Sequence, residues 1–196
     1  MAQADAQQVE FASRDDWRTW LVANHDSSSG VWVVYPKKSA GLTGPQYEDL
    51  ILEALCFGWI DGTLRPVDAA RTSLYFCPRR KGSIWAATNK ARVEQLSAQG
   101  RMHPAGLAAI ERARADGSWT VLDRSEALIP PDELVRAFAR HPGSAEQFEA
   151  FPASARKQLI YRVDSAKRPD TRQRRADEIA RLAQQGIRAD RPPPAP

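Results

Sequence analysis

The chain has 196 residues, of which 42% are hydrophobic and 27% are charged, an ordinary composition for a globular protein. Lys and Arg outnumber Asp and Glu by 28 to 24. This excess admits nucleic acid, phosphorylated metabolites or anionic surfaces as partners, but it is too small to identify a nucleic-acid-binding protein. The longest apolar runs, VWVVY and LILEAL, fall far short of the ~18 residues of a membrane span, so no spanning helix is predicted.

The N-terminal stretch, MAQADAQQVE, has neither the cationic start nor the apolar run of a secretory signal. We therefore expect a cytoplasmic location. Thiols stay reduced in the cytoplasm, so we interpret Cys56 and Cys77 as small buried apolar residues rather than as a redox pair.

The distribution of tryptophan predicts two units. All six tryptophans lie at or before Trp119, and the rest of the chain is rich in Ala, Arg and Glu. A connector at 119–131, WTVLDRSEALIPP, ends in two prolines suited to a break before a helix. We predict an α+β unit at 1–125, a helical unit at 126–186 and a disordered tail at 187–196, where three consecutive prolines follow few apolar residues.

The first unit is expected to alternate helices and strands. SRDDWRTWLVANH begins with Ser13 as N-cap and Asp16 at the capping-box position, and its apolar residues share one helical face. GVWVVYPKK is typical of a strand, and PQYEDLILEALCFG of a helix that ends at Gly58. WIDGTLRPV and TSLYFCPR, separated by DAAR, indicate an antiparallel hairpin. The predicted fold is α+β, with a small mixed sheet and flanking helices.

Alternation along the first hairpin strand places Ile60 and Leu64 on one side. The other side is unusually polar for a strand and consists of Trp59, Asp61, Thr63 and Arg65. Such a face fits a binding surface, and it equally fits the solvated face of an antiparallel sheet. Asp61-Gly62 also fits a tight turn that would shorten the strand.

The junction YFCPRRKGSIWAATNKARVEQL, residues 75–96, leads from a strand through three cations into a helical pattern. If residues 84–98 are helical, Ser83 is the N-cap and Gly82 lets the chain turn into the helix. The unpaired N–H groups and the dipole of such a helix attract anions. Trp85 and Asn89 would share the helical face beside them.

This junction is the predicted ligand site, for a small anionic ligand. Its residues are Arg79, Arg80, Lys81, Gly82, Ser83, Trp85 and Asn89, with Asp61 and Arg65 from the preceding strand. The alternative interpretation is an ordinary capped helix beside a solvated basic loop, in which exposed cations contribute little to folding.

No specific catalytic motif is present. The three histidines are scattered and have no metal-ligand spacing with a cysteine, and Ser83 lacks the G-x-S-x-G elbow. Glu53 and Asp61 would supply acid–base chemistry if they were buried together. We predict no catalytic residue, no metal and no cofactor, and an enzyme stays an open alternative. None of these patterns predicts an oligomeric state.

The remaining sequence is helical in pattern. RMHPAGLAAIERARADG continues the first unit, and four segments bounded by proline or glycine predict a helical array between residues 131 and 186. Residues 156–175 contain eight cations and only two aspartates. The cations are Arg156, Lys157, Arg162, Lys167, Arg168, Arg172, Arg174 and Arg175. Such a basic ridge can contact phosphates. Nucleic acid is therefore an alternative partner, mainly through Lys167, Arg168, Arg172, Arg174 and Arg175.

Three segments carry a resemblance to a known family. EALCFGWIDG, RRKGSIWAATNKARVEQLSAQGRMHPAG and LIYRVDSAKRPDTRQRRADEIARL resemble the bacterial YdeI/OmpD-associated family, also labelled bacteriocin-protection proteins, over roughly residues 10–186. Asp170 replaces the glutamate usual in the family's AKR-x-E-T-R pattern. The resemblance implies a role in stress response or antimicrobial protection, sometimes in the periplasm, and brings no catalytic residues with it.

These observations favour a non-catalytic binding or stress-protection protein with an anion-attracting site at the strand–loop–helix junction. The alternatives are an enzyme acting on a small anionic metabolite through Asp61 with Arg65 or Arg80, and a nucleic-acid-associated protein that uses the basic C-terminal helices.

Overall fold

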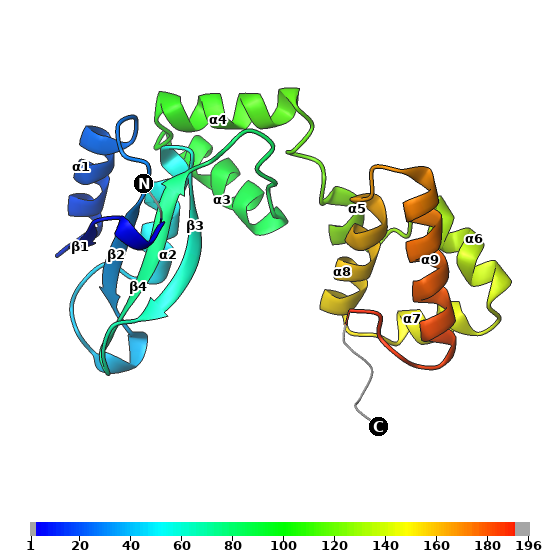
Figure 1. Cartoon of the computed structure of the whole chain (residues 1–196). Helices are drawn as coiled ribbons and strands as arrows, with labels where there is room; N and C mark the ends of the chain where they lie inside the picture. The colour runs from blue at the N-terminus through cyan, green and yellow to red at the C-terminus, as the bar shows by residue number, and fades with distance from the viewer. Residues whose placement is uncertain (1–2, 191–196) are drawn as a thin grey trace. The chain divides into compact units, whose positions relative to one another are not determined.

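A computed structural model describes residues 3–190 of the chain. The chain divides into two compact units, Met1–Trp119 and Thr120–Pro196 (Figure 1). The first contains a small mixed sheet with helices, and the second is helical, which confirms the predicted α+β class. No helix in the described part of the chain is both long and apolar enough to cross a membrane.

The first unit is built on a four-stranded sheet of order β1-β2-β4-β3. Its strands are β1 (Gln8–Glu10), β2 (Val31–Pro36), β3 (Trp59–Pro66) and β4 (Arg71–Pro78). β1 pairs with β2 in parallel, and β4 pairs antiparallel with both β2 and β3, so the sheet is mixed and the predicted hairpin is present. Two short 3₁₀ turns, Gln3–Asp5 before β1 and Lys38–Ala40 after β2, complete the first unit.

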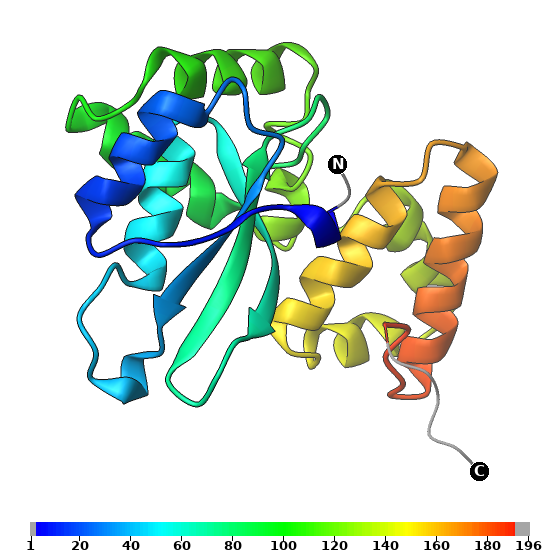
Figure 2. The ribbon, with the colours of Figure 1, turned by 60° about the vertical axis from the view of Figure 1, so that its left-hand side comes forward.

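Helices cover one face of this sheet. They are α1 (Arg14–Asn24), α2 (Tyr47–Cys56), α3 (Ala87–Ala98) and α4 (Pro104–Ala115), and Figure 2 shows them on one side of the strands. Alternate residues of β2 and β4, including Val31, Val33, Leu74 and Phe76, join them in one apolar core. The period of two along the strands therefore aims one set of side chains at the helices.

The start of α1 follows the sequence prediction. The Ser13 hydroxyl accepts the N–H of Asp16 at 3.1 Å and donates to the Asp16 carboxylate at 2.8 Å. Trp17 and Leu21 are fully buried on the inner face of the helix. The indole N–H of Trp17 donates to the carbonyl of Leu50 at 3.1 Å, which ties α1 to α2.

A bulge in β3 overturns the predicted faces of the hairpin. Asp61 lies opposite Phe76 and Leu64 lies opposite Leu74, so three steps along β3 match two along β4. The extra residue reverses the alternation, and Arg65 then lies opposite Ser73. Asp61 therefore shares the face of the core residue Phe76, and Arg65 lies on the opposite face. The prediction of one continuous polar side was wrong.

The helix after the junction begins later than predicted. α3 starts at Ala87, and its N-cap, Ala86, makes no side-chain capping bond. Residues 83–86 form neither helix nor strand, and Trp85 among them lies in the core with 1% of its surface exposed. Ser83 is therefore not the N-cap, and Trp85 and Asn89 do not share a helical face.

The second unit consists of α5 (Asp123–Glu126), α6 (Asp132–Arg140), α7 (Ser144–Glu149), α8 (Ala153–Asp164) and α9 (Pro169–Gln184). The expected inward residues of α8 and α9, among them Leu159, Ile160, Val163 and Ile179, are buried in one core. The helical array predicted from the apolar spacing is thus confirmed.

The two units divide after Trp119, whereas the sequence prediction placed the boundary after residue 125. The short helix α5 belongs with the second unit because Glu126 accepts a hydrogen bond from Lys157 and Arg124 lies 3.7 Å from Asp164. Of the predicted tail, residues 187–190 belong to the described part of the chain. There, Arg162 donates to the carbonyl of Ala189 at 3.1 Å. Residues 191–196 lie outside the described part of the chain.

Candidate functional site

The predicted junction forms a turn in which the side chain of Arg79 is buried rather than solvated. β4 ends at Pro78, and Gly82 supplies the left-handed backbone of the turn, with φ of 74°. Only 7% of the Arg79 surface is exposed, and its guanidinium lies 3.7 Å from the centroid of the Trp85 ring. Arg79 also donates to the carbonyl of Ile84 at 3.1 Å, so the same side chain contacts both Ile84 and Trp85 of the segment 83–86.

The hydrogen-bonding capacity of Arg79 is only partly used. Nη1 donates to Ile84 and, at 3.4 Å, to the hydroxyl of Ser83. Nε and Nη2 are buried and have no partner among the described residues. Burial lowers the pKa of Arg79 to about 10, although the charges of Asp61 and Cys77 act in the opposite direction. The guanidinium is thus a buried cation with unused donors, an arrangement that favours a nearby anion.

Arg79 also lines a small cavity of about 10 Å³. A cavity of this size has room for about one water molecule or one small atom group. Its lining comes from the turn and from the C-terminal part of α4 with the loop after it: Arg79, Arg80, Lys81, Gly82, Ser83, Trp85, Ala109, Arg112, Ala113, Asp116 and Ser118. The hydroxyl oxygen of Ser118 is also buried and meets no hydrogen-bonding partner among the described residues.

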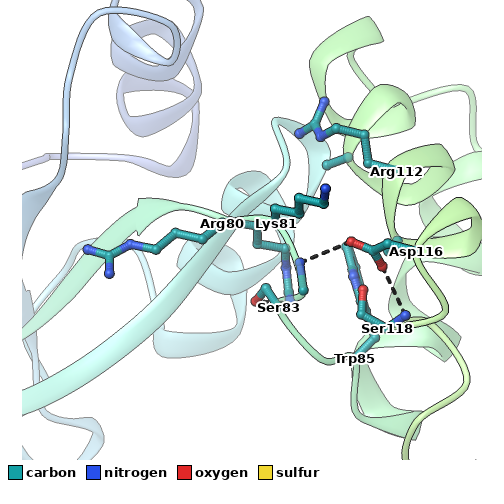
Figure 3. Close-up of a pocket in the computed structure, with 11 residues that line it drawn as sticks. Arg80, Lys81, Ser83, Trp85, Arg112, Asp116 and Ser118 are labelled. Carbon is teal, nitrogen blue, oxygen red and sulfur yellow. Dashed lines mark hydrogen bonds between the residues drawn. The ribbon is translucent and has the colours of Figure 1, made fainter.

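A carboxylate of the chain itself occupies the backbone donors of the turn. Asp116 accepts the N–H of Gly82 and the N–H of Ser118, each at 3.0 Å (Figure 3). The nearby Ser118 hydroxyl, these N–H groups and the charge of Lys81 hold the pKa of Asp116 below its usual value. The turn is therefore suited to bind an anion, and in this structure the anion is Asp116.

Outside the cavity, a surface depression of about 410 Å³ is lined by Lys81, Arg112, Ala115 and Asp116. Figure 3 shows the side chains of Lys81 and Arg112 on the same side of the turn as Asp116, and Arg80 extending the other way. The three cations Arg79, Lys81 and Arg112 against one carboxylate leave an excess of two positive charges. The depression and the cavity share Lys81, Arg112 and Asp116, so together they form one site, which we call the Arg79 pocket.

The structure brings together most of the predicted junction residues but changes their roles. Arg79, Lys81, Gly82, Ser83 and Trp85 all line the Arg79 pocket. No helix N-terminus contributes to it, so the dipole argument was wrong. The helix that reaches the pocket is α4, through its C-terminal end.

Four predicted residues lie elsewhere or point elsewhere. Arg80 borders the pocket, but its side chain extends toward the opposite face of the sheet, where it lines a second depression with Tyr75 and Cys77. Asn89 accepts a hydrogen bond from Arg92 on α3. Asp61 lies close enough to Tyr47 to raise the pKa of that phenol, after the larger effect of burial.

Arg65 is held on the opposite face of the sheet. Its guanidinium stacks on Trp32 at 3.8 Å and donates to Ser73 and Gln8. The bulge therefore separates Arg65 from Asp61, and the enzyme alternative that paired these two residues is not supported by their positions.

Sequence reasoning missed Arg112, Asp116 and Ser118. They follow the junction by about thirty residues, and no local pattern connects them with it. The sequence did predict a helix that ends near Gly117, and Arg112 and Asp116 lie in its last turns. It did not indicate which part of the chain this helix end contacts.

A second charged cluster surrounds Glu53, whose side chain is fully buried. Arg14, Arg18 and Arg101 each donate to its carboxylate at 2.6 Å. Burial alone would raise the pKa of Glu53, but the arginines outweigh it and the net shift is downward. Both oxygens of the Glu53 carboxylate are therefore engaged by arginines. Glu53 does not form the acid–base pair with Asp61 that the sequence left open.

The histidines and cysteines do not form a metal site. Among residues 3–190, no group of three or more His, Cys, Asp or Glu side chains is placed to hold a metal ion. Folding does bring the rings of His25 and His103 together, with centroids 4.7 Å apart. Cys56 and Cys77 are both free thiols, and Cys56 is buried as expected.

The basic ridge of the second unit is largely engaged in internal contacts. Arg162 pairs with Glu178 at 2.8 Å, and Arg172 donates to the carbonyl of Ala166 at 3.1 Å. Arg175 donates to the carbonyl of Arg162. Lys167, Arg168 and Arg174 remain exposed. The nucleic-acid alternative stays a prediction and now depends on these three cations.

Comparison with protein families divides the chain at nearly the same place as the structure. Residues 9–109 match the family described as Domain of unknown function (DUF8412). The chain belongs to this family. Residues 127–186 match the family described as Bacteriocin-protection, YdeI or OmpD-Associated, which confirms the resemblance for the second unit. The resemblance was expected from residue 10 onward, and its N-terminal segments fall instead in the first match. Searches of curated proteins and of solved structures gave no match.

Proposed function

We propose that the protein is a non-catalytic binding protein whose first unit takes up a small ligand through a single anionic group, carboxylate or phosphate, at the Arg79 pocket. The observation that carries this proposal is the buried guanidinium of Arg79, with two nitrogens, Nε and Nη2, that have no partner among the described residues. A buried cation of this kind gains most from an anionic acceptor.

The approach of the ligand follows from the charges. Lys81 and Arg112 border the outer depression and attract the anionic group. Asp116 holds the backbone N–H groups of Gly82 and Ser118, so an incoming anion competes with Asp116 for them. Displacement of Asp116 frees the N–H groups of Gly82 and Ser118 for the ligand. Asp116 thus acts as an internal competitor that sets a threshold for binding.

Catalysis is a weaker interpretation of the same pocket. Its lining residues include neither a histidine nor a cysteine, and both oxygens of Asp116 accept backbone hydrogen bonds. The hydroxyls of Ser83 and Ser118 have no histidine beside them in the lining, and the carboxylate there, Asp116, is engaged by two backbone N–H groups. The family description of the second unit, with its reference to bacteriocin protection, supports a protective role built on binding.

A matched pair of arginine variants tests the proposal. Arg112→Gln removes a charge from the pocket, and Arg80→Gln removes the same charge from the adjacent turn, where the side chain points away. Titration calorimetry at low salt with inorganic phosphate, acetate and a nucleoside monophosphate should show binding to the wild-type protein. Arg112→Gln should weaken it about tenfold, the effect of one charge-assisted contact, and Arg80→Gln less than about twofold.

Two results would refute the assignment. One is that none of these anions binds the wild-type protein at ~10 mM. The other is that the two variants weaken binding equally, because binding would then follow net charge rather than this pocket.

A further inference from the structure

The second unit contains a separate, mostly apolar cavity of about 240 Å³. Its walls come from α6, α7, α8 and the segment before α6: Leu128, Pro130, Val135, Phe138, Ala145, Phe148, Glu149 and Arg156. The rings of Phe138 and Phe148 meet at 5.1 Å with a tilt of 50°. We call this the Phe138 cavity. It lies wholly within the second unit, so it is independent of the Arg79 pocket.

Leu128 reaches this cavity from an unusual backbone conformation. Its φ is 57°, a left-handed value, and it is the one non-glycine residue with positive φ among residues 3–190. It follows the C-cap of α5, and the N–H of Ile129 closes the helix end on the carbonyl of Arg124 at 3.0 Å. Glycine or asparagine usually fills this position. Leucine here places an apolar side chain on the wall of the cavity.

Arg156 supplies the single cation of the Phe138 cavity. Its Nε is buried and unpaired, and no ion pair joins Arg156 to another described residue. Its neighbour Lys157, by contrast, pairs with Glu126. An arginine that lines an apolar cavity and has no ion-pair partner in the described part of the chain provides a place for a ligand oxyanion.

The rest of the lining limits the ligand. Glu149 borders the same cavity and would repel a dianion such as a phosphate monoester. The volume lies below the range of typical drug-sized sites, so it suits one ring or a short branched chain. From these features we infer that the Phe138 cavity binds a small monocarboxylate with a compact apolar body, the carboxylate on Arg156 and the apolar body against the touching rings of Phe138 and Phe148.

The test compares an acid with its neutral amide on the full chain. 3-Phenylpropanoate and 3-phenylpropanamide have the same ring and differ in the charged group. In titrations followed by ¹H–¹⁵N NMR, 3-phenylpropanoate should shift resonances of α6 and α7. Its affinity should be about tenfold higher than that of the amide. Arg156→Gln should abolish this preference and leave amide binding unchanged. Glu149→Gln, a change of equal size on the same rim, should strengthen acid binding about twofold because it removes a like charge.

The Arg79 pocket also attracts carboxylates, so the experiment must show which of the two sites binds 3-phenylpropanoate. Repeating the titration in the Arg112→Gln variant should leave the shifts in α6 and α7 unchanged. The inference is refuted if acid and amide bind equally, if Arg156→Gln keeps the preference, or if all shifts lie in the first unit. Unchanged thermal unfolding of Arg156→Gln confirms that the variant is folded.

Discussion

The guanidinium of Arg79 lies 3.7 Å from the centroid of the Trp85 ring, and both side chains are buried. A desolvated stack of this kind contributes more than the same pair at the surface. The turn that carries the candidate site is therefore also part of the core of the first unit.

The first prediction concerns this stack. Arg79→Ala should lower the free energy of unfolding by about 2–4 kcal/mol, because it leaves a cavity beside Trp85. Arg79→Met should be more stable than Arg79→Ala, since methionine fills the space and does not bury a cation. Arg80→Ala, at the exposed neighbour, should change stability by less than about 0.5 kcal/mol. Urea unfolding measures all three, and equal losses for Arg79→Ala and Arg80→Ala would contradict the buried stack.

The second prediction concerns the internal competitor. Asp116→Asn keeps an acceptor for the N–H of Gly82 but removes the negative charge. Anion affinity at the Arg79 pocket should rise about fivefold, as expected when one like charge is removed near the surface. Glu111→Gln, an exposed change outside the pocket on α4, the helix that ends at Asp116, serves as the control. Calorimetry with phosphate decides, and an affinity that falls in Asp116→Asn would show that Asp116 does not compete with the ligand.

The third prediction concerns Glu53 and acid stability. The folded state lowers the pKa of this carboxyl, so its contribution is complete above the unfolded value, near ~4.3, and is lost as pH falls through the lower folded value. Glu53→Gln should cost about 2–3 kcal/mol at pH 7. This is less than for a wholly buried pair, because the arginines are about one-third exposed.

The measurement is denaturant unfolding between pH 7 and pH 2. The Glu53→Gln variant should show a shallower loss of stability below ~pH 4. Glu48→Gln provides the matched control, because Glu48 lies on the same helix α2 as Glu53 and pairs with Arg92 of α3, but is half exposed. A Glu53→Gln variant no less stable than Glu48→Gln would contradict the role of the three arginines.

The fourth prediction concerns His103. Its pKa lies below the usual value because of burial, followed by the charges of His25 and Arg18. The unfolded chain therefore binds a proton at higher pH than the folded chain, and stability should fall as pH drops below ~6.5. His103 also caps α4, where its ring accepts the N–H of Ala105 at 3.3 Å. His103→Asn retains a capping side chain and should flatten this dependence. An NMR titration of His103 with a midpoint above ~6.5 would contradict the prediction.

Much of the fold could be predicted because its signals are local. The hydroxyl of Ser13 caps a helix three residues away, and the apolar spacing around Leu159 and Ile179 marks helices whose inner faces are buried. Helix caps and periodicities act within one or two turns of the chain, so a short stretch of sequence contains all the atoms involved.

The candidate site was predicted in part, for the residues of the junction itself. The sequence placed Arg79, Lys81, Gly82 and Trp85 together because they are neighbours in the chain. It assigned them to a helix N-terminus, however, and it left Arg79 in solvent.

The sequence by itself determined the α+β class, the hairpin, the helical second unit and the basic character of the junction. The tertiary structure alone decided three further features: the bulge that separates Asp61 from Arg65, the burial of Arg79 on Trp85, and the placement of Asp116 on the N–H of Gly82. Each depends on how the chain packs or registers in three dimensions, and the last joins residues separated by 34 positions. Local conformational preferences do not determine such arrangements, because strand register and core packing depend on contacts between residues that are distant in the sequence.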